Sequence, residues 1–140
     1  MIKDDLKLTG HVSIALNDEV VQEIPNLVVT AGKNWVADRM NDANTVMTHM
    51  AVGTGTTAAD AADTGLETES ARGALTSTTV TNNAVAYVET FAAGTATAAL
   101  TEAGLFDAAS SGDMLARTVF SVVNKGANDS MTVTWTITVS

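Results

Sequence analysis

The sequence predicts an all-β protein, a jelly-roll-like antiparallel β-sandwich with one short helix. Threonine accounts for 22 of the 140 residues, and its branched side chain suits a half-exposed strand better than a helix. Apolar and polar residues alternate in several short segments, most regularly over residues 131–140, and a period of two is typical of strands. The chain lacks the alternation of strands and helices that a parallel sheet requires. We therefore expect residues 1–140 to form one sandwich domain.

The first thirty residues are predicted to form a hairpin. Apolar side chains alternate over residues 6–16, where Gly10 is the one gap on the apolar face. A polar turn at 17–19 separates this segment from its predicted partner strand, residues 20–29. Because proline cannot donate a ladder hydrogen bond, Pro25 predicts that the second strand lies at a sheet edge or contains a bulge.

The one predicted helix covers residues 31–41, where apolar residues recur at helical spacing after Thr30, which is positioned as an N-cap. A loop rich in small and acidic residues is expected over residues 53–70, and Asn82-Asn83 predicts a tight turn. The remaining strand signals lie at residues 48–52, 74–81, 84–91, 99–106, 114–123 and 131–140. Seven or eight short strands with one helix fit a sandwich.

Composition and charge exclude several classes of function. The net charge is −9 and the seven basic residues are scattered, so we expect no direct contact with nucleic acid, which requires clustered Lys and Arg. There is no cysteine, which excludes disulfides and thiolate metal sites. No apolar segment approaches the ~20 residues of a membrane span, and the first residues do not read as a signal peptide. We therefore expect synthesis in the cytoplasm and no membrane partner.

No set of residues predicts a catalytic, metal or cofactor site. His11 and His49 are the only histidines, and each lies in a strand pattern without a second ligand at metal spacing. The segment Gly53-Thr54-Gly55-Thr56-Thr57 is superficially similar to a phosphate-binding loop, but it lacks the lysine that reaches the phosphates. We expect a mobile connecting loop there, and a structural or binding protein that uses no cofactor, not an enzyme.

The predicted loop contains a group of acidic residues, namely Asp60, Asp63, Glu67 and Glu69. Their spacing does not match the twelve-residue calcium loop, in which oxygen ligands alternate and a glycine stands at the sixth position. A solvated acidic loop is the favoured interpretation. The alternatives are calcium binding and the capture of a basic residue from a partner chain.

The last predicted strand has two distinct faces, one apolar and one formed by four threonines. A core strand with a solvated threonine face is the favoured interpretation, and an edge strand whose threonine face or backbone meets another subunit is the alternative. Chain ends are usually loose unless docked, so both termini are candidates for contact with a partner. The candidate interaction residues are Met1, Ile2, Lys3, Asp4, Asp5, Thr132, Thr134, Thr136, Thr138 and Ser140.

A set of hydrophobic and turn segments carries a family resemblance: His49–Gly55, Leu66–Glu69, Ala99–Phe106, Met114–Phe120 and the alternating residues 131–140. Over nearly the whole chain they resemble small virion proteins of tailed bacteriophages, most closely the capsid cement (decoration) proteins of short-tailed phages. The segment Glu102–Phe106 also resembles the N-terminal domains of tail-collar fibres. Those domains usually have a basic residue in place of Thr101 and continue into a fibre, whereas this sequence ends at Ser140.

The resemblance to cement proteins implies a jelly-roll-like sandwich on the outer surface of an icosahedral capsid. The expected partners are the major capsid protein of the same phage, which it would bridge to its neighbours, and further copies of this chain, with a dimer favoured. The alternatives are a tail or tail-fibre attachment protein and a carbohydrate-binding module on the virion surface. A carbohydrate module would require exposed aromatic platforms, and aromatic residues make up only 4% of the sequence.

Overall fold

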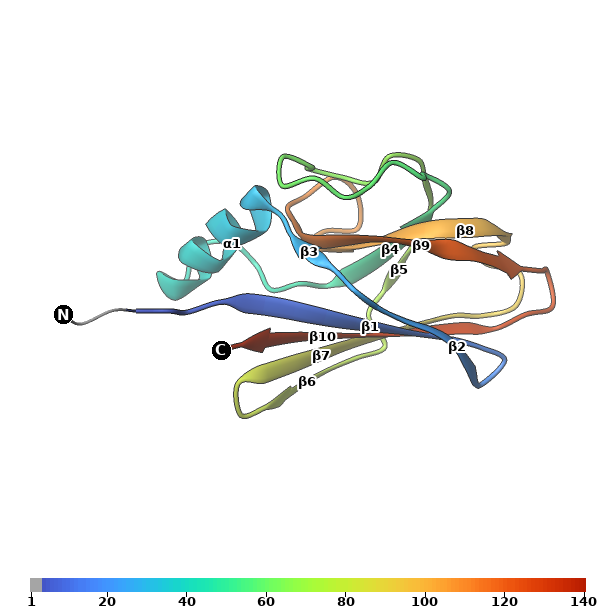
Figure 1. Ribbon diagram of the computed structural model, residues 1–140, viewed down its shortest axis with the longest axis horizontal. Coiled ribbons are helices and arrows are strands. Elements are labelled where there is room, and N and C mark those ends of the chain that lie inside the picture. The colour runs from blue at the N-terminus through green and yellow to red at the C-terminus, as the bar shows by residue number, and fades with distance from the viewer. Residues whose placement is uncertain (1–3) are drawn as a thin grey trace.

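The computed structural model describes residues 4–140, which form two antiparallel five-stranded sheets packed face to face (Figure 1). Sheet A has the strand order β2-β1-β10-β7-β6, and sheet B has the order β3-β9-β8-β4-β5. The predicted all-β sandwich with one short helix is confirmed. The elements are β1 Leu8–Leu16, β2 Glu19–Pro25, β3 Leu27–Val28, α1 Thr30–Met40, β4 His49–Gly53, β5 Glu69–Ala74, β6 Ser77–Thr81, β7 Ala84–Phe91, β8 Ala98–Phe106, β9 Met114–Lys125 and β10 Met131–Val139.

The chain passes from one sheet to the other four times, between β2 and β3, β5 and β6, β7 and β8, and β9 and β10. These exchanges bring distant segments together. β1 pairs with β10 along its whole length, from Leu8 opposite Val139 to Leu16 opposite Met131. Among the described residues, 4–140, no helix has the length and apolar character needed to cross a membrane.

The core lies between the two sheets, and β10 shows most clearly how the sequence forms it. Met131, Val133, Trp135 and Ile137 are each at most 5% exposed, whereas the threonines between them are half-buried on the opposite face. β10 pairs with β1 on one side and with β7 on the other. The core-strand interpretation is therefore confirmed. The edge-strand alternative is wrong, because the β10 backbone is already paired on both sides.

β1 and β2 form the predicted hairpin, and β2 lies at an edge of sheet A as Pro25 predicted. The predicted partner strand over residues 20–29 is nevertheless divided, because the chain leaves sheet A after Pro25 and β3 pairs with β9 in sheet B. Gly10 makes room for this crossing, since a Cβ atom at Gly10 would lie 1.4 Å from Oδ1 of Asn26. The Asn26 side chain thus fills the gap that Gly10 leaves in the apolar pattern.

Helix α1 lies at one end of the sandwich, at the left of Figure 1, where Trp35 joins the main core. It begins one residue before the predicted start. The predicted N-cap role of Thr30 is wrong, because Val29 holds the N-cap position and no side-chain cap is formed. Val29 is fully buried, and its N–H donates to the carbonyl of Leu115 in β9 at 3.3 Å. Gly32 permits this close packing, since a Cβ atom there would lie 2.1 Å from the same carbonyl oxygen.

The strand predicted over residues 74–81 is β6, Ser77–Thr81, whereas Ala74 is the last residue of β5, an additional strand in the other sheet. β5 begins at Glu69, inside the predicted loop, and pairs with β4, whereas β6 pairs with β7. The chain crosses at Leu75 and Thr76, and alternation of polar and apolar residues does not reveal the change of sheet. The predicted turn between β6 and β7 is confirmed, with Asn82 at a φ of 53°.

The outer faces of the two sheets differ. The loop of residues 54–68, green in Figure 1, lies over the outer face of sheet B, and the first turn of α1 borders it. A second apolar cluster forms beneath them from Val29, Ala51, Phe106 and Met114. The outer face of sheet A carries no such layer in the part of the chain that the structure describes (Figure 1).

Candidate functional site

The loop of residues 54–68 is fastened to sheet B by a buried carboxylate. Glu102 on β8 is 0% exposed and accepts five hydrogen bonds. Its Oε2 accepts from the backbone N–H groups of Gly55 at 2.7 Å and Thr68 at 2.8 Å. Its Oε1 accepts from the Glu67 N–H at 2.9 Å and from two nitrogens of Arg117. The carboxylate therefore ties both ends of the loop to the sheet.

Arg117 on β9 completes this arrangement, which we call the loop clamp: Glu102, Arg117 and Asp63. Arg117 is 2% exposed, and its Nε and Nη2 donate to Glu102 at 3.2 and 3.0 Å. Its Nη1 donates to Asp63 at 2.9 Å and its Nη2 to the carbonyl of Thr57 at 3.0 Å. Each guanidinium nitrogen is used, so the clamp holds the middle of the loop and offers no free charge to a substrate.

The Gly53–Gly55 segment, which is similar to a phosphate loop, packs against the Glu102 carboxylate of the loop clamp. A Cβ atom at Gly53 would lie 2.7 Å from the Glu102 Oε2, and one at Gly55 would lie 2.4 Å from it. Glycine at both positions lets the backbone approach the carboxylate closely. The anion that this loop binds is thus a side chain of the protein itself. The signal in the sequence is a Glu and an Arg on the apolar segments 99–106 and 114–123, but nothing in their spacing predicts that they pair.

The four acidic residues of the predicted loop are separately engaged within the chain. Asp63 pairs with Arg117, and Glu69 pairs with Arg72 at 2.7 Å. Asp60 accepts from the N–H of Ala62, and Glu67 accepts from the N–H groups of Thr56 and Thr57. Within residues 4–140 no group of three or more His, Cys, Asp or Glu side chains could hold a metal ion.

Hydrogen bonds from the Thr57 side chain, and then from the N–H groups of Thr56 and Thr57, hold the pKa of Glu67 below its ordinary value. An open depression of about 420 Å³ lies beside the clamp, and its lining includes Thr57, Asp63, Glu67 and Arg117. These polar groups already have partners within the chain. Their hydrogen bonds hold the loop in place.

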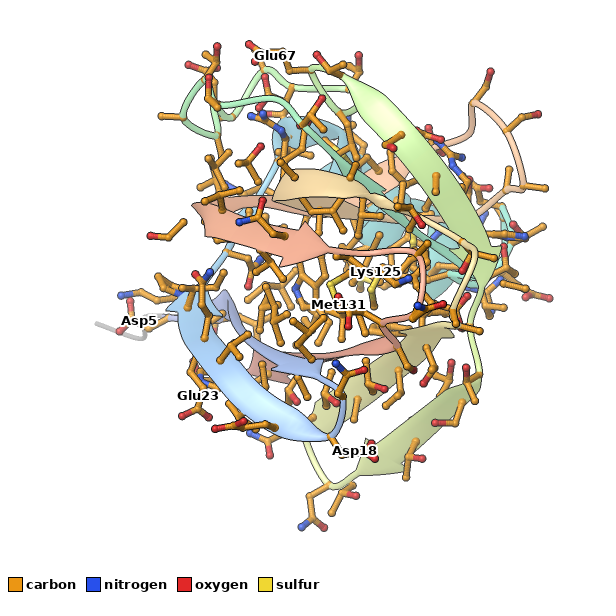
Figure 2. The ribbon with its side chains drawn as sticks, turned by 90° about the vertical axis from the view of Figure 1, so that its right-hand side faces the viewer. Asp5, Asp18, Glu23, Glu67, Lys125 and Met131 are labelled. Carbon is orange, nitrogen blue, oxygen red and sulfur yellow. The ribbon has the colours of Figure 1, made fainter. Side chains whose placement is uncertain are left out.

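Two further buried charges also hold turns. Lys125 at the end of β9 is 2% exposed, and its Nζ donates to the carbonyls of Ala92 and Thr95 at 3.0 and 2.6 Å. Figure 2 shows Lys125 and Met131 between the two sheets. Glu89 on β7 is 7% exposed and accepts from the Thr76 hydroxyl at 2.8 Å. The buried charges of the described chain are therefore structural.

The two histidines lie apart from each other. His11 on β1 is exposed, and its Nε2 is 3.8 Å from a carboxylate oxygen of Glu23 on the neighbouring strand. His49 on β4 is half-buried, and its Nδ1 is 2.7 Å from the Thr48 hydroxyl. Neither belongs to a group of side chains that could hold a metal ion among the described residues.

The structure places the predicted interaction residues in three different settings. Asp4 and Asp5 are exposed, whereas Met1, Ile2 and Lys3 lie outside the described residues. Ser140 is exposed, but its N–H and C=O both pair with the backbone of Lys7, at 2.9 and 2.8 Å. Thr132, Thr134, Thr136 and Thr138 lie together on the outer face of sheet A, where strand pairing forms rows of small side chains.

These rows extend across four strands of sheet A. Thr136, for example, pairs with His11 on β1 and Ala86 on β7, and Ala86 pairs with Thr79 on β6. Apart from His11, every side chain of this surface is Thr, Ser, Ala or Val. We call the surface the threonine face, and its residues are Thr9, His11, Ser13, Ala15, Ser77, Thr79, Thr81, Ala84, Ala86, Val88, Thr90, Thr132, Thr134, Thr136 and Thr138. No Asp, Glu, Lys or Arg side chain belongs to these four strands of the face, and Glu23 on the edge strand β2, opposite Ser13, borders it.

The fold and these surfaces define an antiparallel β-sandwich with one covered sheet and one open sheet face that is rich in threonine. No family model, curated protein or solved structure matches the chain.

Proposed function

We propose that this chain is a virion structural protein of a tailed bacteriophage, a cement (decoration) protein on the outer surface of the capsid. In this role it binds neighbouring major capsid proteins and stabilises the DNA-filled head. The specific assignment to a capsid rests on the resemblance of its hydrophobic and turn segments to cement proteins. Two properties of the molecule support a binding role: its buried charges are engaged in holding loops, and one whole sheet face is open.

The threonine face is the observation that carries the proposal. Docking this face would remove no charged side chain from water, so it avoids the desolvation penalty that accompanies buried ions. Its hydroxyl groups can both donate and accept hydrogen bonds to a partner surface. A net charge of −9 makes the rest of the molecule repel DNA, so the face suits a protein partner.

The alternative of a carbohydrate-binding module is disfavoured by the aromatic residues. Such a site would need exposed rings, and the six aromatic side chains of the sequence are each at most 9% exposed: Trp35, Tyr87, Phe91, Phe106, Phe120 and Trp135. A tail or tail-fibre attachment protein is the second candidate. It could use the same open face, so location on the particle distinguishes it from a cement protein.

The decisive experiment compares phage particles with and without this protein. Particles that lack it should assemble but burst at lower temperature and in lower salt, and added protein should restore their tolerance, because bound neighbours stabilise the lattice by mass action. Electron microscopy of labelled protein should place it on the head. Unchanged tolerance of heat and low salt, or label on the tail alone, would contradict the proposal.

The docking face is tested with charge variants. Thr134→Glu and Thr136→Glu place a carboxylate in the middle of the threonine face and should reduce capsid binding at least tenfold. Val122→Glu is the control, because Val122 is 53% exposed on β9, away from that face. Circular dichroism must first show that the variants are folded. Binding by both threonine variants at the level of the control would exclude the threonine face as the contact.

A further inference from the structure

The edges of the two sheets differ in how well they are protected against pairing with another strand. β2 carries Pro25 and two glutamates, β3 has two residues, and β5 carries Glu69 and Arg72 beside a bulge. Charge, proline, bulges and short length all discourage the addition of a further strand. β6 has none of these devices, since its sequence is Ser-Thr-Thr-Val-Thr and each residue is exposed.

β6 also lies in a part of the chain that is free of charge. Residues 73–88, from β5 through the β6–β7 hairpin, contain no Asp, Glu, Lys or Arg. Two copies of a protein with a net charge of −9 repel each other over most of their surfaces. At this edge they can approach without opposing carboxylates. Val80 is 69% exposed there, so strand pairing would also remove an apolar side chain from water.

The hairpin determines which backbone groups of β6 face outward. Thr81 and Ala84 flank a two-residue turn, and the flanking pair of such a turn exchanges both hydrogen bonds. Hydrogen-bonded and non-hydrogen-bonded pairs alternate along the ladder, so the N–H and C=O groups of Thr78 and Val80 point away from β7. Within the described residues, β6 makes no backbone hydrogen bond other than those that pair it with β7.

We propose that β6 is a docking edge for a second copy of this chain, and that two β6 strands pair antiparallel about a two-fold axis at Thr79. In this register Thr78 of one copy faces Val80 of the other, and the outward groups of both residues find partners. The two copies of Thr79 face each other as a non-hydrogen-bonded pair, and the two A sheets become one continuous sheet. A two-fold axis makes the contact self-complementary, which fits a closed dimer.

This inference rests on the proposed function and specifies how further copies of this chain, which the resemblance to cement proteins implies as partners, would bind. A contact of five residues on each side falls short of the roughly 1,200–2,000 Å² that stable interfaces bury. The free dimer is therefore weak, and it would be strengthened where both copies are held on one capsid. The test uses purified protein without capsids, so its failure and the failure of the cement proposal are separate results.

Disulfide trapping detects such a weak dimer, because the chain contains no cysteine. Cα atoms of a non-hydrogen-bonded pair are about 4.5 Å apart, within the range of a disulfide. Thr79→Cys should therefore form a disulfide-linked dimer under mild oxidation. Thr81→Cys is the matched control on the same strand and face, because its two copies would lie four residues out of register, roughly 13 Å apart. The first variant should cross-link at least about tenfold faster than the second.

A proline variant tests whether the backbone makes the contact. Val80→Pro removes an outward N–H without removing a donor to β7, and proline is tolerated at such edge positions. Combined with Thr79→Cys it should abolish cross-linking while circular dichroism and Tm stay unchanged. Val20→Pro on β2, tested in the same background, should leave cross-linking unchanged, since β2 is the opposite edge of sheet A.

Equal cross-linking of Thr79→Cys and Thr81→Cys would overturn the inference, because it indicates random collision. Undiminished cross-linking of a folded Val80→Pro variant would also overturn it. If β6 amides become protected only on addition of capsids, with no trapped dimer in solution, the occupant of the edge is a different protein and the second-copy assignment is wrong.

Discussion

Arg117 donates two hydrogen bonds to a single oxygen of Glu102, at 3.2 and 3.0 Å, where neither side chain is more than 2% exposed. The two residues lie on adjacent strands of sheet B, and their remaining hydrogen bonds reach the loop of residues 54–68. The net contribution of a buried ion pair to stability is often small, but removal of one partner leaves the other charge buried and unpaired. The pair is therefore best probed by substitution of a single partner.

Glu102→Gln should destabilise the protein by about 3–5 kcal/mol, the usual effect of breaking a buried ion pair. The amide replaces one acceptor oxygen with donor hydrogens, which would face the N–H groups of the loop. Urea denaturation measures the change in the free energy of unfolding. Glu23→Gln on the exposed edge strand β2 is the control, and its effect should stay within about 0.5 kcal/mol. A Glu102→Gln effect no larger than the control would contradict the clamp.

Two glycines of the same loop should respond in opposite directions. A Cβ atom at Gly55 would lie 2.4 Å from Oε2 of Glu102 and 2.5 Å from Cβ of Glu67, so Gly55→Ala must displace the clamp and destabilise the protein. A Cβ atom at Gly65 would meet no other atom within 4 Å, and the φ of Gly65 is not positive. Gly65→Ala should raise stability by about 0.4–1 kcal/mol through the unfolded state. Thermal unfolding of both variants measures these changes in stability. A loss of stability in both variants would contradict this account.

Acid should weaken the attachment of the loop through Glu67. The folded-state pKa of this carboxyl is lowered from 4.5 by hydrogen bonds from Thr57 and Thr56. A lowered pKa contributes stability that is fully present above pH 4.5 and is lost as the pH falls through the folded-state value. The stability difference between the wild type and Glu67→Gln should therefore be constant above that pH and shrink below it. Urea denaturation between pH 7 and pH 3 measures this difference, and a difference independent of pH would show that Glu67 is not involved.

The sequence predicted the elements whose signal is local. The unbroken alternation of residues 131–140 predicted β10 and its buried face, and Pro25 predicted an edge or bulged strand, because each depends on neighbouring residues only. The loop clamp was missed because Arg117 lies 15 residues from Glu102 and 54 from Asp63, and only the folded sheet brings them together. The crossing at Leu75 and Thr76 was missed for the same reason, since the pattern of a strand does not state which sheet it joins.

A final prediction concerns the crossing from β2 to β3, where the backbone of Gly10 and the side chain of Asn26 occupy adjoining space. A Cβ atom at Gly10 would lie 1.4 Å from Oδ1 of Asn26, and both polar atoms of that amide are buried with no hydrogen-bond partner within residues 4–140. Gly10→Ala alone should therefore be strongly destabilising, because the amide must move and nothing in the described chain favours a new position.

Asn26→Ala removes the atoms that would clash with a Cβ atom at residue 10. It also removes two buried polar atoms that have no hydrogen-bond partner in the described chain. The single change should cost little, and Gly10→Ala should be better tolerated when Asn26 is already alanine. The coupling energy from the double-mutant cycle should be favourable by about 0.5–3 kcal/mol, which is typical of residues in direct contact. Chemical denaturation of the wild type, both single variants and the double variant gives this quantity. Additive effects would mean that the two residues do not share this space in solution, and that Gly10 is required for a reason other than the Asn26 side chain.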